Sequence, residues 1–152
     1  MSQDAYLAAL KMLARRELSE AQVRQRLIRR GEPVDAIDEA IARLKVEGSI
    51  DDERVAGIIA RHETSLRKRG RRRVQQQIEA AGISRAIAER AVDEAFRDSD
   101  PDALLQASLA RRLRGRERIA DEREFQRLFR YLSAQGFERD RILAHLRKYE
   151  PK

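Results

Sequence analysis

Arginine is the side chain whose spacing points most plainly to a function in this sequence. One cluster consists of Arg67, Lys68, Arg69, Arg71, Arg72 and Arg73. A second consists of Arg111, Arg112, Arg114, Arg116 and Arg118, and shorter pairs stand at Arg15, Arg16 and at Arg29, Arg30. Guanidinium groups make planar, forked hydrogen bonds to phosphate and to carboxylate. We expect these side chains to bind a nucleic acid or the acidic surface of a protein partner.

The basic clusters differ in how well helix stability alone explains them. The pairs at 15–16 and 29–30 stand at expected helix C-termini, where the helix dipole favours cations. Arg71, Arg72 and Arg73 begin an expected helix, where the dipole opposes them. Their mutual repulsion adds a further cost. We therefore expect a partner outside the domain to compensate this charge. If the repeats described below stack regularly, the clusters at 67–73 and 111–118 form one basic strip.

Acidic side chains are most concentrated at Asp51, Asp52 and Glu53. Such carboxylates can hold Mg²⁺ for phosphoryl chemistry. The cluster follows Gly48, however, and directly precedes an expected helix. We favour a hinge at Gly48 with Asp51 and Asp52 capping that helix. A contact with a basic neighbour is the remaining interpretation.

Other catalytic patterns are missing from the sequence. There is no P-loop and no H-E-x-x-H motif, and the absence of cysteine excludes disulfides, thiolate zinc ligands and thiol catalysis. His62 and His145 stand beside apolar stripes, so we expect partly buried helix histidines. The sequence therefore predicts no catalytic residue, no metal, no cofactor and no enzymatic activity.

The charge balance agrees with a binding protein. The 152 residues include 33 basic and 26 acidic side chains, for a net charge of +7, which attracts nucleic acid or an acidic partner. No apolar run approaches the roughly 18 residues typical of a membrane-spanning helix. The N-terminal residues lack the pattern of a signal peptide. We expect a soluble, cytoplasmic protein with no membrane association.

The elements that position these side chains are predicted to be helices throughout. Apolar residues recur at intervals of three and four, as in Val34, Ile37, Ile41 and Leu44, which is the period of an amphipathic helix. Ser19 and Gln22 match a capping box, and Gly31 matches a helix C-cap. Pro33 suits the start of the next helix, and Asp100 followed by Pro101 reads as an N-cap and first helical residue. The expected class is all-α.

The glycines at 31, 82 and 136 reveal an internal repeat. Leu27, Ile78 and Leu132 each stand four residues before one of them, and the spacings are 51 and 54 residues. Each repeat contains three helices, expected at 4–16, 20–30 and 34–47, at 52–67, 71–81 and 84–97, and at 101–114, 121–135 and 138–149. The repeat boundaries are 1–48, 49–99 and 100–152. Because such small bundles bury little surface alone, we expect an elongated, curved chain of bundles. No heptad seam is present, so we expect a monomer.

Three stretches resemble a known family. Residues 44–54 read LKVEGSIDDER, residues 70–83 read GRRRVQQQIEAAGI, and residues 9–20 read ALKMLARRELSE. Together they resemble the RecX family of bacterial recombinase regulators over nearly the whole chain. Val55 and Ser49 stand where the family usually has aromatic residues, a departure that concerns the hinge.

The resemblance implies an inhibitor of the RecA recombinase. Such a protein lies along the groove of the RecA filament on single-stranded DNA and suppresses ATP hydrolysis and strand exchange in recombination, DNA repair and the SOS response. Its partners are then the RecA filament and single-stranded DNA, contacted directly or through the filament. The alternative is a general helical nucleic-acid-binding module, with Val74–Ala81 or Phe125–Gln135 as the groove helix. A magnesium nuclease using Asp51 and Asp52 is the least favoured reading.

Overall fold

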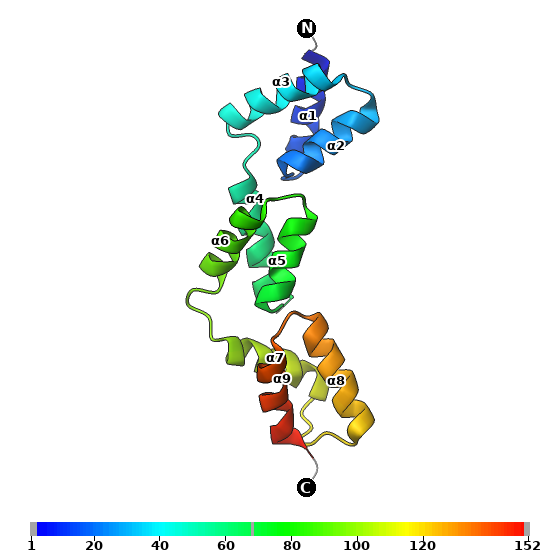
Figure 1. The fold of residues 1–152 in the computed structure, drawn as a ribbon, viewed down its shortest axis with the longest axis vertical. Helices are drawn as coiled ribbons and strands as arrows, with labels where there is room; N and C mark the ends of the chain where they lie inside the picture. Colours follow the sequence, from blue (N-terminus) through cyan, green and yellow to red (C-terminus); the bar gives the residue numbers. More distant parts are fainter. Residues whose placement is uncertain (1–2, 68, 151–152) are drawn as a thin grey trace. The chain divides into compact units, whose positions relative to one another are not determined.

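The computed structural model describes residues 3–67 and 69–150, and this part of the chain is helical with no strand (Figure 1). The helices are α1 (Gln3–Arg15), α2 (Glu20–Arg30), α3 (Val34–Val46), α4 (Asp52–Arg61), α5 (Arg71–Ala80), α6 (Arg85–Ala95), α7 (Pro101–Leu113), α8 (Glu122–Ala134) and α9 (Arg139–Leu146). A π-helical turn at His62–Leu66 follows α4, and a 3-10 turn at Arg147–Tyr149 follows α9. The all-α class and the tandem three-helix order are confirmed.

Local capping interactions determine where several helices begin and end. Ser19 Oγ accepts a hydrogen bond from the Gln22 backbone N–H, and the Gln22 side chain accepts one from the Ser19 N–H in return. Gly31 adopts φ +90°, the left-handed C-cap conformation. Asp100 accepts from the Asp102 N–H at 2.9 Å, with Pro101 as the first helical residue.

The expected position of Pro33 differs slightly from the structure. Pro33 is the N-cap of α3 with ψ 148°, and the helix begins one residue later at Val34. An extended ψ keeps Pro33 outside the helix, although its ring fixes a φ that a first helical residue shares.

Two compact units make up the chain. Residues 1–58 and 78–91 form the first, and residues 59–77 and 92–152 form the second. Repeat 1 lies wholly in the first unit and helices α7–α9 lie in the second. Among the described helices, none combines the length and the apolar run that crossing a membrane requires.

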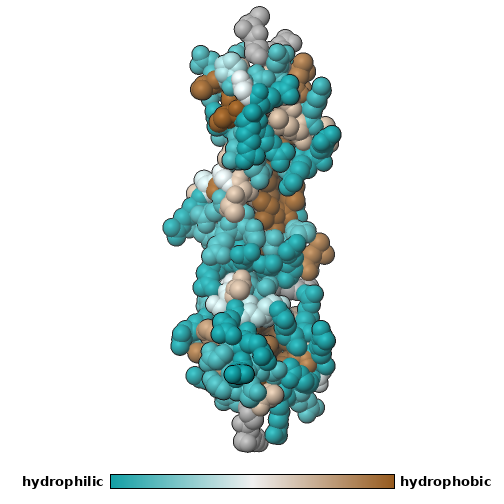
Figure 2. Space-filling model, turned by 90° about the vertical axis from the view of Figure 1, so that its right-hand side faces the viewer, coloured by the Kyte–Doolittle hydropathy of each residue, from teal (hydrophilic) through white to brown (hydrophobic). Residues whose placement is uncertain are grey.

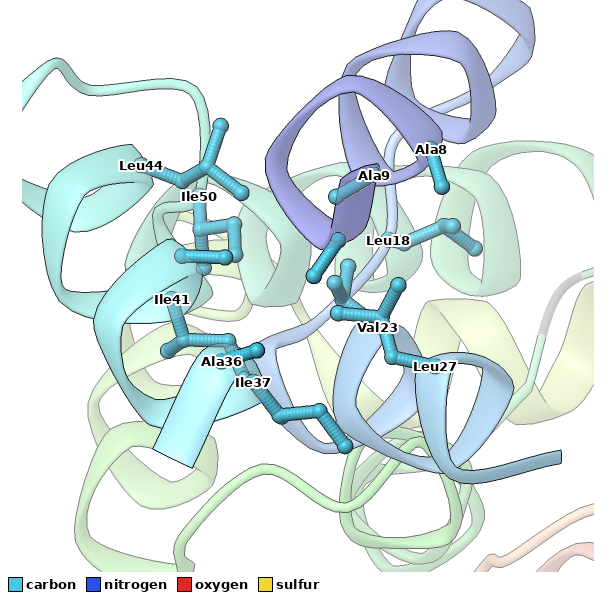
Figure 3. Packing of buried hydrophobic residues seen from close by; sticks show 12 residues of the cluster. Ala8, Ala9, Leu18, Val23, Leu27, Ala36, Ile37, Ile41, Leu44 and Ile50 are labelled. Carbon is cyan, nitrogen blue, oxygen red and sulfur yellow. The ribbon is translucent and has the colours of Figure 1, made fainter. Parts of the chain in front are cut away.

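Small and branched apolar side chains form the core of the first unit (Figure 3). Alanines on α1, including Ala5 and Ala9, are fully buried and let the backbone of α1 approach α2 and α3 closely. Leu27 and Leu44 are also fully buried. Burying one such leucine contributes about 1.5–3 kcal/mol, so a core without tryptophan still holds the three helices together.

Larger side chains form the core of the second unit. Leu105, Leu109, Leu132, Ile142 and Leu146 are all fully buried there. The aromatic residues of α8 are only partly buried against this cluster. The α8 helix therefore has one edge that carries aromatic surface towards solvent.

The same joint between successive repeats occurs once in each unit. In the first unit, Ser19 Oγ donates to the carbonyl of Ala81 at 2.5 Å. In the second, the Gly70 N–H donates to the carbonyl of Gln135 at 2.7 Å. Each donor directly precedes the second helix of one repeat, and each acceptor directly precedes the turn glycine of the next. The carbonyl end of one helix thus meets the amide end of another, which suits both helix dipoles.

Glycine is required at these joints because the backbones nearly touch. A methyl group added at Gly70 would lie 2.6 Å from the carbonyl carbon of Gly136, and one added at Gly136 would overlap the backbone of Arg73. In the first unit, a methyl group added at Gly82 would overlap the side-chain methyl group of Ala21. Of the three glycines that revealed the repeat, Gly82 and Gly136 thus also permit the repeats to pack, whereas nothing lies within 4 Å of a methyl group added at Gly31.

The π-helical turn changes the face on which residues after α4 lie. His62, expected to be partly buried, has a side chain that is 50% exposed, whereas the neighbouring Glu63 is buried. Leu66 is 69% exposed. The turn inserts an extra residue per hydrogen-bonded ring, as the bond from the Arg67 N–H to the His62 carbonyl shows. A prediction that continues the regular helical period past the end of α4 therefore assigns the wrong residues to the buried face.

Candidate functional site

The face of the molecule drawn in Figure 2 is mainly hydrophilic. Within this charged surface, the second unit contains an open hollow of about 450 Å³ with arginine on most of its wall. Its lining consists of Leu66, Arg67, Arg69, Arg111, Arg112, Arg114, Tyr131 and Gln135. We call it the arginine hollow. It brings together side chains from both predicted clusters.

Three elements position the lining of the arginine hollow. Arg111 and Arg112 are in the last turn of α7, Tyr131 and Gln135 are at the end of α8, and Arg67 follows the π-helical turn. The guanidinium of Arg112 lies over the ring of Tyr131, 4.0 Å from its centroid. This stacking fixes the plane of one cation and leaves its N–H edges for a ligand.

Most arginines of the hollow have no acidic partner among the described residues. Among the ion pairs of the described residues, none includes Arg67, Arg111, Arg112 or Arg114. Arg69 is the exception, with its Nε 3.7 Å from Glu63 Oε2, a distance at which neither atom has a hydrogen-bond partner. The hollow thus concentrates positive charge that the unit does not neutralise.

Arg71, Arg72 and Arg73, which the sequence analysis grouped with Arg67 and Arg69, do not line the hollow. Arg71 forms an ion pair with Asp93, and Arg72 donates to the Ser133 carbonyl at 2.8 Å. Arg73 is half-buried where its backbone meets Gly136. Arg71 and Arg72 thus have partners within the unit, whereas Arg73 Nε is buried without a hydrogen-bond partner among the described residues.

The second cluster is divided in a similar way. Arg116 makes a forked pair of hydrogen bonds to Glu124 at 2.9 and 3.0 Å, so this guanidinium already has a carboxylate partner. Arg118 is exposed and lies outside the lining of the hollow. Lys68 lies outside the described residues. The hollow therefore contains members of both clusters, and Arg116 and Arg118 lie outside its lining.

A second basic hollow lies in the first unit, between α1 and α2. Its volume is about 570 Å³, and Lys11, Arg15, Arg16, Arg26 and Arg30 line it together with Asp4 and apolar residues of α1. Arg29, the remaining predicted residue, is exposed outside it.

The sequence interpretation missed Lys11 and Arg26 because they are isolated in the sequence. Each stands four residues before a predicted arginine on the same helix, Lys11 before Arg15 and Arg26 before Arg30. This i, i+4 spacing places the two side chains of each pair on one face of the helix. The spacing was the feature of the sequence from which Lys11 and Arg26 could have been predicted.

The two hollows occupy corresponding places in their repeats. Arg26 and Arg30 stand five residues and one residue before Gly31, as Tyr131 and Gln135 do before Gly136. Part of the opposing wall comes from the repeat's first helix, along the length of α1 in the first hollow and from the last turn of α7 in the arginine hollow. The arginine hollow differs from the first hollow in that Leu66, Arg67 and Arg69 of the preceding repeat complete its wall.

Asp51, Asp52 and Glu53 form contacts within the fold. Asp51 Oδ1 accepts from the Arg54 N–H at 3.1 Å at the start of α4, after Gly48 in a left-handed turn. Asp52 instead accepts from the N–H of Glu20 at 2.8 Å, so it caps α2 rather than its own helix. Glu53 pairs with Arg90 at 2.9 Å. In the described part of the chain, no three histidine, aspartate or glutamate side chains are grouped as a metal site requires.

His145 belongs to a buried polar network that the sequence did not reveal. Its ring nitrogens lie 3.0 Å from Gln106 Oε1 and 3.1 Å from Asp102 Oδ1, and Gln106 also bonds to the Tyr149 hydroxyl. The hydrogen bond from His145, with a further one from Arg141, lowers the pKa of Asp102. This network ties α7 to α9 and the chain end, and it supplies no nucleophile.

Comparisons with known proteins identify the family. A family model described as "RecX, first three-helix domain" matches residues 5–44, which correspond to α1–α3. A regulatory protein RecX of Halorhodospira halophila is 33% identical over 138 residues, covering 90% of this chain and 83% of the relative. This chain belongs to the RecX family. The resemblance noted in the sequence is therefore confirmed.

Further RecX proteins support the assignment. The regulatory protein RecX of Syntrophotalea carbinolica is 32% identical over 135 residues, which cover 88% of each chain. The crystal structure of RecX from Lactobacillus salivarius superposes with a TM-score of 0.73 at 22% identity, covering 95% of this chain and 96% of that one. The latter shows a shared fold. The relatives are named regulatory proteins.

Proposed function

We propose that this RecX protein inhibits the RecA recombinase by binding along the RecA filament on single-stranded DNA and suppressing ATP hydrolysis and strand exchange. This role belongs to recombination, DNA repair and the SOS response, in the cytoplasm. Membership of the RecX regulatory family supports the proposal, and so does the surface chemistry described above. The protein acts by occupying a surface rather than by catalysis.

One observation carries the proposal on the structural side. Both units contain a basic hollow at corresponding places, and most of the arginines in them have no acidic partner among the described residues. A filament repeats the same anionic features along its length. Once one contact has formed, the other contacts of the same chain form at a high effective concentration. Several weak contacts can then give a high overall affinity. A monomer built of three repeats, 1–48, 49–99 and 100–152, is suited to such binding.

The proposed site consists of the residues lining the two hollows. In the second unit these are Arg67, Arg69, Arg111, Arg112 and Arg114, and in the first they include Arg15, Arg16 and Arg30. Arg71 and Arg72 are not part of it, because their contacts stabilise the unit.

The test is ATP hydrolysis by the cognate RecA on single-stranded DNA, titrated with this protein. We expect inhibition at concentrations well below that of RecA. Binding of the protein to the same DNA without RecA is measured in parallel. Unchanged hydrolysis, together with tight and salt-sensitive binding to bare DNA, would contradict the proposal and favour a general nucleic-acid-binding module.

A further inference from the structure

Three structural irregularities meet at the arginine hollow. Arg114 adopts φ 51°, ψ 45°, and among the described residues it is the one non-glycine residue with a positive φ. The π-helical turn ends at Leu66, which is on the wall beside Arg67. Glu63 Oε2 and Arg69 Nε are buried without hydrogen-bond partners in the same segment. Left-handed non-glycine residues, π-turns and unpaired buried polar atoms are each uncommon and gather at functional sites.

Arg114 indicates that the arginine itself is useful at this position. A C-cap in the left-handed conformation strongly favours glycine, and Gly115 is the very next residue. Holding a bulky side chain there costs about 1–2 kcal/mol. The conformation directs the backbone so that a third guanidinium joins Arg111 and Arg112 in the lining of the hollow.

The positive charge of the hollow suits an anionic ligand that carries several negative charges along its length. Several arginines elsewhere in the unit pair with a carboxylate, as Arg116 does with Glu124 and Arg71 with Asp93. In the hollow, five guanidinium groups line one opening. Among the described residues, Glu63 is the one carboxylate that pairs with any of them, at Arg69. A folded protein surface carries its carboxylates among other side chains, whereas a phosphodiester strand presents one negative charge per nucleotide.

The apolar part of the hollow fits the same kind of ligand. Leu66 is 69% exposed and Tyr131 is half-buried beneath Arg112. Aromatic and apolar side chains beside a basic groove are the surfaces on which bases stack in single-strand-binding proteins. The hollow is open rather than enclosed, so a strand can pass across it.

We infer that the arginine hollow holds the phosphodiester backbone of a nucleic-acid strand, and that Arg67, Arg111, Arg112 and Arg114 contact its phosphates. This inference rests on the proposed function in one respect, namely that the strand is the single-stranded DNA of the RecA filament. Binding to the strand itself requires no recombinase.

The test uses fluorescence anisotropy of the full chain with an end-labelled oligothymidylate across a salt series. The double variant R67Q/R111Q removes two exposed arginines of the hollow. The double variant R123Q/R147Q is the matched control, because it removes two exposed arginines of the same unit that lie outside both hollows. Helical circular dichroism and thermal unfolding establish that both variants are folded.

The expected result is several-fold weaker binding for R67Q/R111Q, with a salt slope smaller by about 1.4, since each phosphate contact on a single strand contributes about 0.7. R123Q/R147Q should change the slope by less than half that amount. Equal losses for the two variants would overturn the inference, because net charge alone would then explain binding. Loss of labelled polyglutamate binding by R67Q/R111Q, with unchanged DNA binding, would also overturn it and assign the hollow to protein carboxylates.

These outcomes are separable from those that test inhibition of RecA. If the oligothymidylate result is as expected and RecA hydrolysis is unaffected by the wild-type chain, the proposed function fails and the inference holds. If hydrolysis is inhibited and both double variants bind DNA alike, the inference alone fails.

Discussion

Neighbouring arginines in this chain have different tasks, and their contacts distinguish them. Arg71 and Arg72 neutralise Asp93 and the carbonyl end of α8 within the second unit. Arg111 and Arg112 line an open hollow instead. The sequence grouped these side chains by charge and proximity. It could not separate them, because an ion pair across 22 residues or a hydrogen bond across 61 depends on tertiary packing.

Charge reversal should separate the two groups by stability. Arg71→Glu with Arg72→Glu places acidic side chains beside Asp93 and beside a carbonyl group, so we expect the free energy of unfolding to fall by about 1–2 kcal/mol. Arg111→Glu should leave it within about 0.5 kcal/mol, because Arg111 is exposed and has no partner among the described ion pairs. Urea unfolding followed by circular dichroism measures both. Equal losses of unfolding free energy in the two variants would contradict this distinction, and Arg71 and Arg72 would again be candidates for the binding surface.

Glu124 should contribute to stability in a pH-dependent way. Its pKa is lowered from 4.5, first by the hydrogen bonds from Arg116 and then by the N–H of Ala120. The unfolded chain therefore binds the proton more tightly than the folded chain. The contribution is complete well above pH 4.5 and is lost as pH falls through the lowered pKa of the folded state.

The variant Glu124→Gln removes this titration. Its free energy of unfolding, measured by urea from neutral pH down to about pH 3, should fall less steeply with acidification than that of the wild type. Glu117→Gln, which removes an exposed carboxylate without these hydrogen bonds, serves as the control. If the two variants give the same pH profile, Glu124 does not stabilise the folded state in this way.

At the scale of elements, the repeat predicts most of what the structure contains. The expected helix bounds differ from the observed ones by a few residues, because apolar period, capping residues and glycines all act locally. The exceptions are the π-helical turn after α4 and the role of Asp52 as a cap for α2. A π-turn inserts one residue, and no residue type in the sequence marks the insertion. Asp52 accepts a hydrogen bond from Glu20, which is 32 residues away in the sequence, so its role depends on tertiary packing.

The inter-repeat joint provides a test of element packing. Gly136→Ala introduces a methyl group that overlaps the Arg73 backbone at φ +101°, whereas Gly115→Ala meets nothing within 4 Å at φ +84°. Both alanines suffer the left-handed penalty of about 1–2 kcal/mol. We expect Gly136→Ala to cost about 1–3 kcal/mol more than Gly115→Ala, because the joint must open or shift. Thermal unfolding of the two variants measures the difference, and equal losses would mean that the joint tolerates the methyl group.

For the whole molecule, the sequence supported the RecX family before any coordinates, whereas the location of the site required the fold. The three-repeat pattern and the motifs near residues 9–20, 44–54 and 70–83 carried the family. The two hollows became visible only when the helices brought Arg67 and Arg111 together in one unit, and Lys11 and Arg26 together in the other. A protein with this distribution of unneutralised cations is suited to binding a long, anionic filament at several points.

Direct binding to the assembled filament tests this account most closely. RecA is assembled on single-stranded DNA with a non-hydrolysable ATP analogue and sedimented with increasing amounts of the wild-type chain. We predict saturable co-sedimentation that exceeds the amount recovered with the same DNA in the absence of RecA. Recovery that is no greater with the filament than with bare DNA would contradict the account, because the recombinase would then contribute nothing to recognition.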